Sequence, residues 1–151
     1  MAGRNSREVE LAGRSWVVSR LLAHGIEVAT PVVDSGIDLI AFKEAGVGGI
    51  KALPLQLKCA TGEAFSLNAK YAERGITMIY VWRVMIAPTA FIMSYEEALA
   101  VLGEKSASTA SFAEQGAYSM SSVSKQKREH LSEYQDRWDW LKARIEAQPE
   151  S

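Results

Sequence analysis

The chain has 151 residues, of which 48% are hydrophobic and 23% charged, and its formal net charge at pH 7 is −1. These values are typical of one globular domain spanning residues 1–151, and a charge near zero argues against a general binder of polyanions, although a local basic face remains compatible with it. The only cysteine, Cys59, excludes an intramolecular disulfide framework. No apolar run reaches the length of a membrane span or forms the core of a signal peptide, so a cytoplasmic protein is expected.

The first predicted element is a helix over residues 6–23. Ser6 is a suitable N-cap and Gly25 a suitable stop. Glu10 and Arg14 are expected to fall on its apolar face, pointing toward the core or a cleft, and their spacing of four also permits an ion pair. At 100° per residue, the apolar members of that face are Leu11, Val17, Val18, Leu21 and Leu22.

Strands are predicted over residues 26–33, 37–43 and 53–61, with a turn at 34–36 and a glycine-rich hairpin connection at 45–49. Further strands are predicted at 65–67, 76–84 and 90–93, of which 76–84 has the continuous apolar pattern of a central strand. Ser94 and Glu97 predict a capping box for a helix that Gly103 ends. Residues 104–123 show little periodicity and are predicted as a long loop, and residues 125–147 as mostly helical. The pattern predicts an α/β fold, with helices flanking one mixed sheet of four to five strands.

Three polar residues interrupt the apolar strands. Asp38 lies within the strand at 37–43, and Gln56 and Lys58 lie within the strand at 53–61. Alternation places Gln56 and Lys58 on one face, about 7 Å apart along the strand, and Cys59 on the opposite face as a small core residue. Because unpaired polar groups are costly to bury, we expect these three to have a function.

Their chemistry suits a metal-dependent hydrolase. Asp38 could hold a hard divalent cation, Mg²⁺ or alternatively Mn²⁺, and the Gln56 carbonyl could provide a second oxygen ligand. Glu10 could supply a third ligand, directly or through water. Lys58 could orient or deprotonate the attacking water, or stabilise charge on a phosphate.

The helix, the Gly36-Ile37-Asp38 strand and the Gln56-Leu57-Lys58 strand resemble the PD-(D/E)XK nuclease superfamily. The similarity is to its short members, the Holliday-junction resolvases and those group I intron homing endonucleases with a Gln-x-Lys motif. It implies a restriction-endonuclease-like fold and Mg²⁺-dependent cleavage of DNA. Family members often carry Glu after a glycine in the first helix. That slot is Arg14 here, following Gly13, so Glu10 one turn earlier is its substitute.

DNA is the expected partner, and a domain of this size favours a homo-oligomer, a dimer or tetramer, for a longer or symmetric site. The candidate DNA-binding residues are Arg14 and the basic cluster of Lys125, Lys127 and Arg128, for which solvated surface charge is the competing interpretation. Two alternatives to an endonuclease remain open. One is a non-catalytic DNA-binding or protein-interaction module with the same fold, and the other is an unrelated α/β domain in which Asp38 and Lys58 form a buried ion pair.

Overall fold

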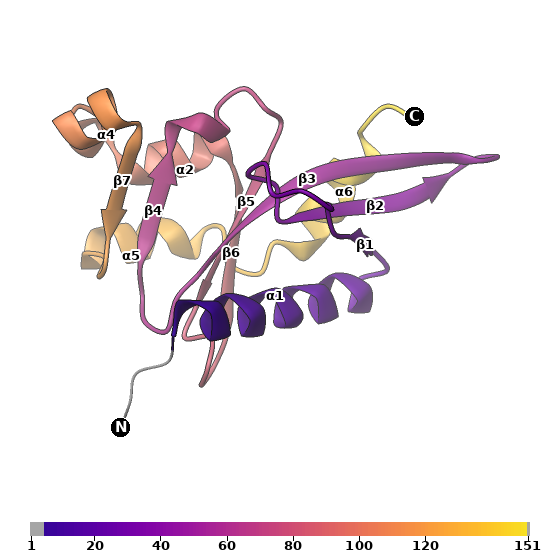
Figure 1. Cartoon of the computed structure of the whole chain (residues 1–151), viewed down its shortest axis with the longest axis horizontal. Coiled ribbons are helices and arrows are strands. Elements are labelled where there is room, and N and C mark those ends of the chain that lie inside the picture. Colours follow the sequence, from indigo (N-terminus) through magenta and orange to yellow (C-terminus); the bar gives the residue numbers. More distant parts are fainter. Residues whose placement is uncertain (1–4, 151) are drawn as a thin grey trace.

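The computed structural model describes residues 5–150, which form an α/β fold around a five-stranded mixed sheet (Figure 1). The strands are β1 (Glu27–Ala29), β2 (Leu39–Ala45), β3 (Gly49–Cys59), β4 (Phe65–Asn68), β5 (Thr77–Trp82), β6 (Thr89–Ser94) and β7 (Ala117–Met120). The order in the sheet is β1-β2-β3-β5-β6, in which only β3 and β5 are parallel neighbours. β4 and β7 form a separate antiparallel ribbon. The prediction of a mixed sheet flanked by helices is confirmed.

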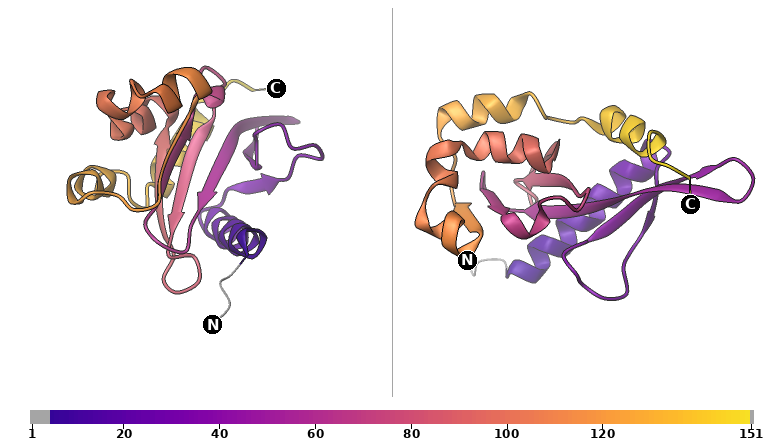
Figure 2. Two further views of the ribbon diagram at one scale, coloured as in Figure 1. Left: turned by 60° about the vertical axis from the view of Figure 1, so that its left-hand side comes forward. Right: turned by 90° about the horizontal axis from the view of Figure 1, so that it is seen from above.

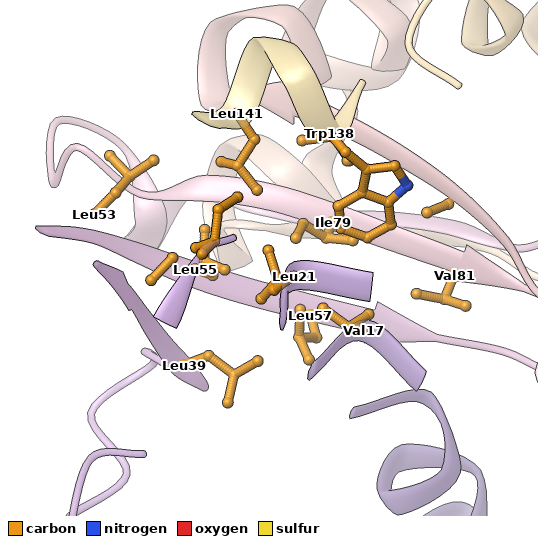
Figure 3. Close-up of a cluster of buried hydrophobic side chains, with 14 of the residues drawn as sticks. Val17, Leu21, Leu39, Leu53, Leu55, Leu57, Ile79, Val81, Trp138 and Leu141 are labelled. Carbon is orange, nitrogen blue, oxygen red and sulfur yellow. The ribbon is translucent and has the colours of Figure 1, made fainter. Parts of the chain in front are cut away.

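Helices and the ribbon cover the two faces of this sheet. The helices are α1 (Ser6–Ala23), the short 3₁₀ helix η1 (Ala69–Tyr71), α2 (Tyr95–Leu102), α3 (Glu104–Ala107), α4 (Ala110–Gln115), α5 (Lys125–Ser132) and α6 (Trp138–Glu146). α1 and α6 share one apolar cluster with the sheet, in which Val17 and Leu21 lie close to Leu55 and Leu57 (Figure 3). α2, α5 and the ribbon form a second cluster on the other face, and Figure 2 shows α1 on the opposite side of the sheet from them.

The long strand β3 changes partner along its length. Its first part pairs with β2, from Ala45 opposite Gly49 to Leu39 opposite Leu55. Its last part, from Leu55 to Cys59, pairs with the parallel strand β5 on the other edge. All six residues of β5 are buried, as expected of a central strand. The end of β3 therefore continues past the start of β2, and this step in the sheet is where Asp38 lies.

The predicted apolar face of α1 is wrong in part. Leu11 and Leu22 are 64% and 57% exposed. The reason is Gly13: a Cβ there would lie 2.3 Å from the Cys59 sulfur, so the helix approaches β3 through its glycine. The buried residues follow this contact at every fourth position, as Val9, Gly13, Val17 and Leu21. Glu10 and Arg14 consequently lie at the edge of the helix interface.

One prediction for the C-terminal half is also wrong. Residues 104–123 are not a loop, since they contain α3, α4 and β7, and β7 pairs with β4. Residues 125–147 are mostly helical, as predicted, and form two helices. α5 ends at Ser132, Asp136 has a positive φ of 53°, and α6 begins at Trp138. The capping box of α2 is confirmed, with both of its hydrogen bonds present between Ser94 and Glu97.

Candidate active site

Asp38 lies immediately before β2, at the step in the sheet. Its backbone N–H donates to the Leu55 carbonyl at 2.9 Å, which continues the strand ladder by one residue. Its side-chain Oδ2 accepts a hydrogen bond from the Leu57 N–H at 2.8 Å. Beyond Leu55, β3 has no β2 partner on this edge, and the Asp38 carboxylate accepts the Leu57 N–H in place of a strand carbonyl. This hydrogen bond holds the carboxylate beside the end of β3.

Gln56 and Lys58 come from the final part of β3 and lie opposite Met78 and Tyr80 of β5. Gln56 is only 7% exposed. Its Nε2 donates a long hydrogen bond of 3.5 Å to the Leu57 carbonyl, whereas its buried Oε1 has no hydrogen-bond partner among residues 5–150. A buried oxygen without a donor is costly, and it is a chemically suitable ligand for a hard cation or a bound water.

The ammonium group of Lys58 lies over the ring of Tyr71, 5.5 Å from its centroid. Lys70 places a second ammonium group 5.2 Å from the centroid of the same ring. The tyrosine therefore holds two cations beside the end of β3 through cation–π attraction. Asp38 and Lys58 form no ion pair within the described residues, so the alternative of a structural Asp38–Lys58 pair is wrong in this form.

The ion-pair partner of Asp38 is Arg14 of α1. One guanidinium nitrogen lies 3.9 Å from Asp38 Oδ1 and 3.4 Å from Glu10 Oε1. The Asp38 side chain is 14% exposed, that of Arg14 33% and that of Glu10 61%. Arg14 thus partly neutralises both carboxylates, although Glu10 remains accessible to solvent.

One pocket of about 330 Å³ brings these side chains together. Four of the predicted residues line it, namely Glu10, Asp38, Gln56 and Lys58. The prediction missed Asp34, Lys70 and Tyr71 as lining residues. The Asp34-Ser35-Gly36 sequence signals a turn, and Asp34 accepts a hydrogen bond from the Gly36 N–H at 3.0 Å, but a turn signal does not reveal which cavity the turn borders.

The burial of Asp38 has an electrostatic consequence. Desolvation raises the pKa of its carboxyl above the ordinary 3.8, and the nearby acids Glu10 and Asp34 act in the same direction. The Leu57 N–H and Arg14 oppose this rise by stabilising the charged form. Burial also raises the pKa of the Cys59 thiol to about 12, so Cys59 is a packing residue and a poor nucleophile at neutral pH.

The second group of predicted DNA-binding residues lies elsewhere, on α5, and none of them lines this pocket. Lys127 donates to the Val101 and Leu102 carbonyls at 3.0 and 2.8 Å, which satisfies the C-terminal end of α2. Arg128 pairs with Glu63 at 2.7 Å. Lys125 is exposed at the start of α5. Lys127 and Arg128 therefore have structural partners within the protein, whereas Lys125 is exposed.

Oxygen ligands for a cation are present, but few are acidic. No group of three or more His, Cys, Asp or Glu side chains that could hold a metal occurs within residues 5–150. The expected ligand set contains only two such side chains, Glu10 and Asp38, and its third member, Gln56, has a buried Oε1 without a hydrogen-bond partner among those residues.

Comparison with known proteins adds no assignment: no family model, curated protein or solved structure matches the chain. None of the described helices has both the length and the apolar character needed to cross a membrane.

Proposed function

We propose that this chain is a Mg²⁺-dependent endonuclease that hydrolyses phosphodiester bonds of DNA, with a restriction-endonuclease-like fold. The observation that carries the proposal is the single pocket lined by Glu10, Asp38, Gln56 and Lys58. Residues from α1, from the turn before β2 and from the end of β3 converge there, although Glu10 and Gln56 lie 46 positions apart in the chain. Asp38, Gln56 and Lys58 are the positions that correspond to the PD-(D/E)XK motif that the sequence resembles.

Each residue has a separate role in this proposal. Asp38, Gln56 and Glu10 would hold the cation through oxygen atoms. When bound, Mg²⁺ would polarise the phosphodiester and lower the pKa of a bound water. Lys58, kept in place by Tyr71, would orient the attacking water and stabilise negative charge developing on the phosphate. Lys70, on the same ring, adds a second cation for the phosphate backbone.

The raised pKa of Asp38 makes the proposed site sensitive to acid. A carboxyl must be ionised to bind a cation, so protons compete with Mg²⁺ at Asp38. Because burial raises that pKa above 3.8, the loss of Mg²⁺ affinity on acidification begins at a higher pH than for an ordinary aspartate.

The test is cleavage of plasmid and branched DNA by the purified protein with Mg²⁺, with Mn²⁺ or with a chelator. We expect metal-dependent cleavage that Asp38→Ala and Lys58→Ala each reduce by about 100-fold or more. Matched controls are the exposed residues Asp139 and Lys105, whose alanine variants should cleave like the parent. A second readout is the melting temperature, which Mg²⁺ should raise in the parent and not in Asp38→Ala.

The non-catalytic module is the second candidate, and the position of Arg14 favours it. A guanidinium 3.9 Å from Asp38 provides positive charge where the family places an acidic residue. This candidate predicts DNA or protein binding without cutting under every metal condition, and no Mg²⁺-dependent rise in melting temperature. That pair of results would overturn the endonuclease proposal.

We propose in addition that the active form is a homo-oligomer, since one domain of this size covers only about one turn of duplex. Sedimentation with and without DNA tests this, and a monomer under both conditions contradicts it.

A further inference from the structure

Arg14 lies against two of the three proposed metal ligands, and one of its nitrogens faces both of them. Its Nη2 is 3.4 Å from Glu10 Oε1 and 3.9 Å from Asp38 Oδ1. The other carboxylate oxygen of Asp38, Oδ2, accepts the Leu57 N–H at 2.8 Å. Oδ1 is therefore the Asp38 oxygen that remains for a cation, and it is the oxygen that Arg14 faces.

The contacts of Arg14 are of a kind that breaks easily. Its hydrogen bond to Glu10 is long, at 3.4 Å, and its distance of 3.9 Å to Asp38 is too great for a hydrogen bond. The Arg14 and Glu10 side chains are 33% and 61% exposed. Ion pairs this exposed add little to stability, and the arginine side chain has many rotamers. The guanidinium can therefore leave the carboxylates without disturbing the fold.

A cation bound at these oxygens would compete with the guanidinium. Arg14 does not line the pocket, and it reaches the two carboxylates from one turn further along α1 than Glu10. A divalent cation that enters from the pocket would then lie close to a positive charge, and like charges at such short range repel. The carboxylate oxygens therefore serve either the cation or Arg14.

The helix offers Arg14 no replacement partner after such an exchange. Within four positions of Arg14 along α1, the only acidic residue is Glu10 itself. A guanidinium released beside a DNA-cleaving site has a chemically suitable partner in the substrate, because its planar set of N–H donors matches the oxygens of a phosphate.

We propose that Arg14 and the cation compete for Asp38 Oδ1 and Glu10 Oε1, and that the displaced guanidinium binds a phosphate of the DNA. The proposal rests on the proposed function for the cation and for the DNA. It makes Arg14 a positioning residue that couples the two ligands. DNA draws Arg14 away from the carboxylates and so strengthens metal binding, and the metal strengthens DNA binding by the same factor.

The first measurement is metal affinity without DNA, by isothermal titration calorimetry with Mn²⁺ and with Ca²⁺ at about pH 8, well above the usual range of carboxyl pKa values. Arg14→Gln removes the competing charge and should bind both metals about tenfold more tightly than the parent. Arg14→Lys keeps the charge and should stay close to the parent. Arg20→Gln is the matched control, because Arg20 is exposed on the same helix and does not line the pocket.

The second measurement is the affinity for a labelled DNA duplex, by fluorescence anisotropy in Ca²⁺ and in a chelator. Ca²⁺ takes oxygen ligands as Mg²⁺ does, and electrophoresis of the recovered duplex verifies that it is uncut. The gain in DNA affinity from Ca²⁺ should be about tenfold larger for the parent than for Arg14→Gln, because only the parent releases a guanidinium to the phosphate. Since Arg14 leaves the carboxylates when DNA is bound, this factor should equal the factor that calorimetry gives for Ca²⁺.

Equal metal affinity of the parent and Arg14→Gln would overturn the proposal, as would an equal gain from Ca²⁺ in the two proteins. Metal-dependent cleavage together with either result would contradict only this proposal. Metal binding by Arg14→Gln and not by the parent would support the competition and contradict the endonuclease, since the parent would then carry Arg14 in place of the cation. No metal binding by the parent or by any variant would contradict both.

Discussion

The buried side-chain oxygen of Gln56 links the stability of the protein to its proposed chemistry. Without a donor, Oε1 destabilises the folded state, so Gln56→Met should raise the free energy of unfolding by about 1 kcal/mol, measured in urea with a chelator present. The same variant should also lack the rise in melting temperature that the proposed Mg²⁺ site predicts for the parent. The exposed Gln115 is the control, and Gln115→Met should change neither quantity. A clear loss of stability in Gln56→Met would show instead that the amide is a structural group.

Asp38 should make stability depend on pH with a sign that its burial determines. Burial raises the folded-state pKa of Asp38 above 3.8, so the folded protein favours the protonated carboxyl. The stability that this preference contributes is fully present below pH 3.8 and is lost as the pH rises through the folded-state pKa. Asp38→Asn does not titrate. The variant should therefore gain stability relative to the parent between pH 3 and pH 7, as measured by urea unfolding in chelator. A difference in the free energy of unfolding between variant and parent that stays constant over this range, or that favours the parent as the pH rises, would contradict the raised pKa.

At the scale of elements, the contact between α1 and β3 depends on Gly13. A Cβ there would lie 2.3 Å from the Cys59 sulfur and 2.8 Å from its Cβ. Although alanine is favoured over glycine within a helix, Gly13→Ala should therefore lower the free energy of unfolding, by about 1–3 kcal/mol in a urea titration. Gly62 is the matched control, because a Cβ there meets no atom within 4 Å, and Gly62→Ala should be close to neutral. A stability gain in Gly13→Ala would show that helix and strand do not approach this closely.

The same contact explains which parts of the fold could be predicted from the sequence. Alternation along β2 and β3 correctly separated Gln56 and Lys58 from the core face, and the capping residues located α2. The apolar periodicity of α1 predicted the wrong buried face. The buried face contains Gly13, and a count of apolar side chains does not include glycine. Such a count also failed for β7, whose four residues have too little periodicity and whose partner β4 lies about 50 residues earlier in the chain.

The candidate site was partly predictable for a related reason. Asp38, Gln56 and Lys58 stand out because polar side chains interrupt apolar strands. Tyr71 and Lys70 do not, because they reach the pocket from η1, a turn of three residues without a pattern of its own. Their role depends on a crossover from β3 to β5 that only the three-dimensional structure shows.

At the scale of the whole molecule, charge and pocket arrangement together predict how DNA affinity depends on salt. If Lys58 and Lys70 are the principal cations for the phosphate backbone, two phosphates are neutralised. For single-stranded DNA this gives a slope of log affinity against log salt of about −1.4, or a loss of about 7-fold between 50 and 200 mM salt. Anisotropy titrations with a labelled single-stranded oligonucleotide in chelator measure it. Lys70→Ala should reduce the slope by about 0.7, whereas Lys127→Ala should leave it unchanged because that ammonium group binds the end of α2. A much steeper slope that falls in Lys127→Ala would instead place the phosphate backbone on α5 and away from the pocket.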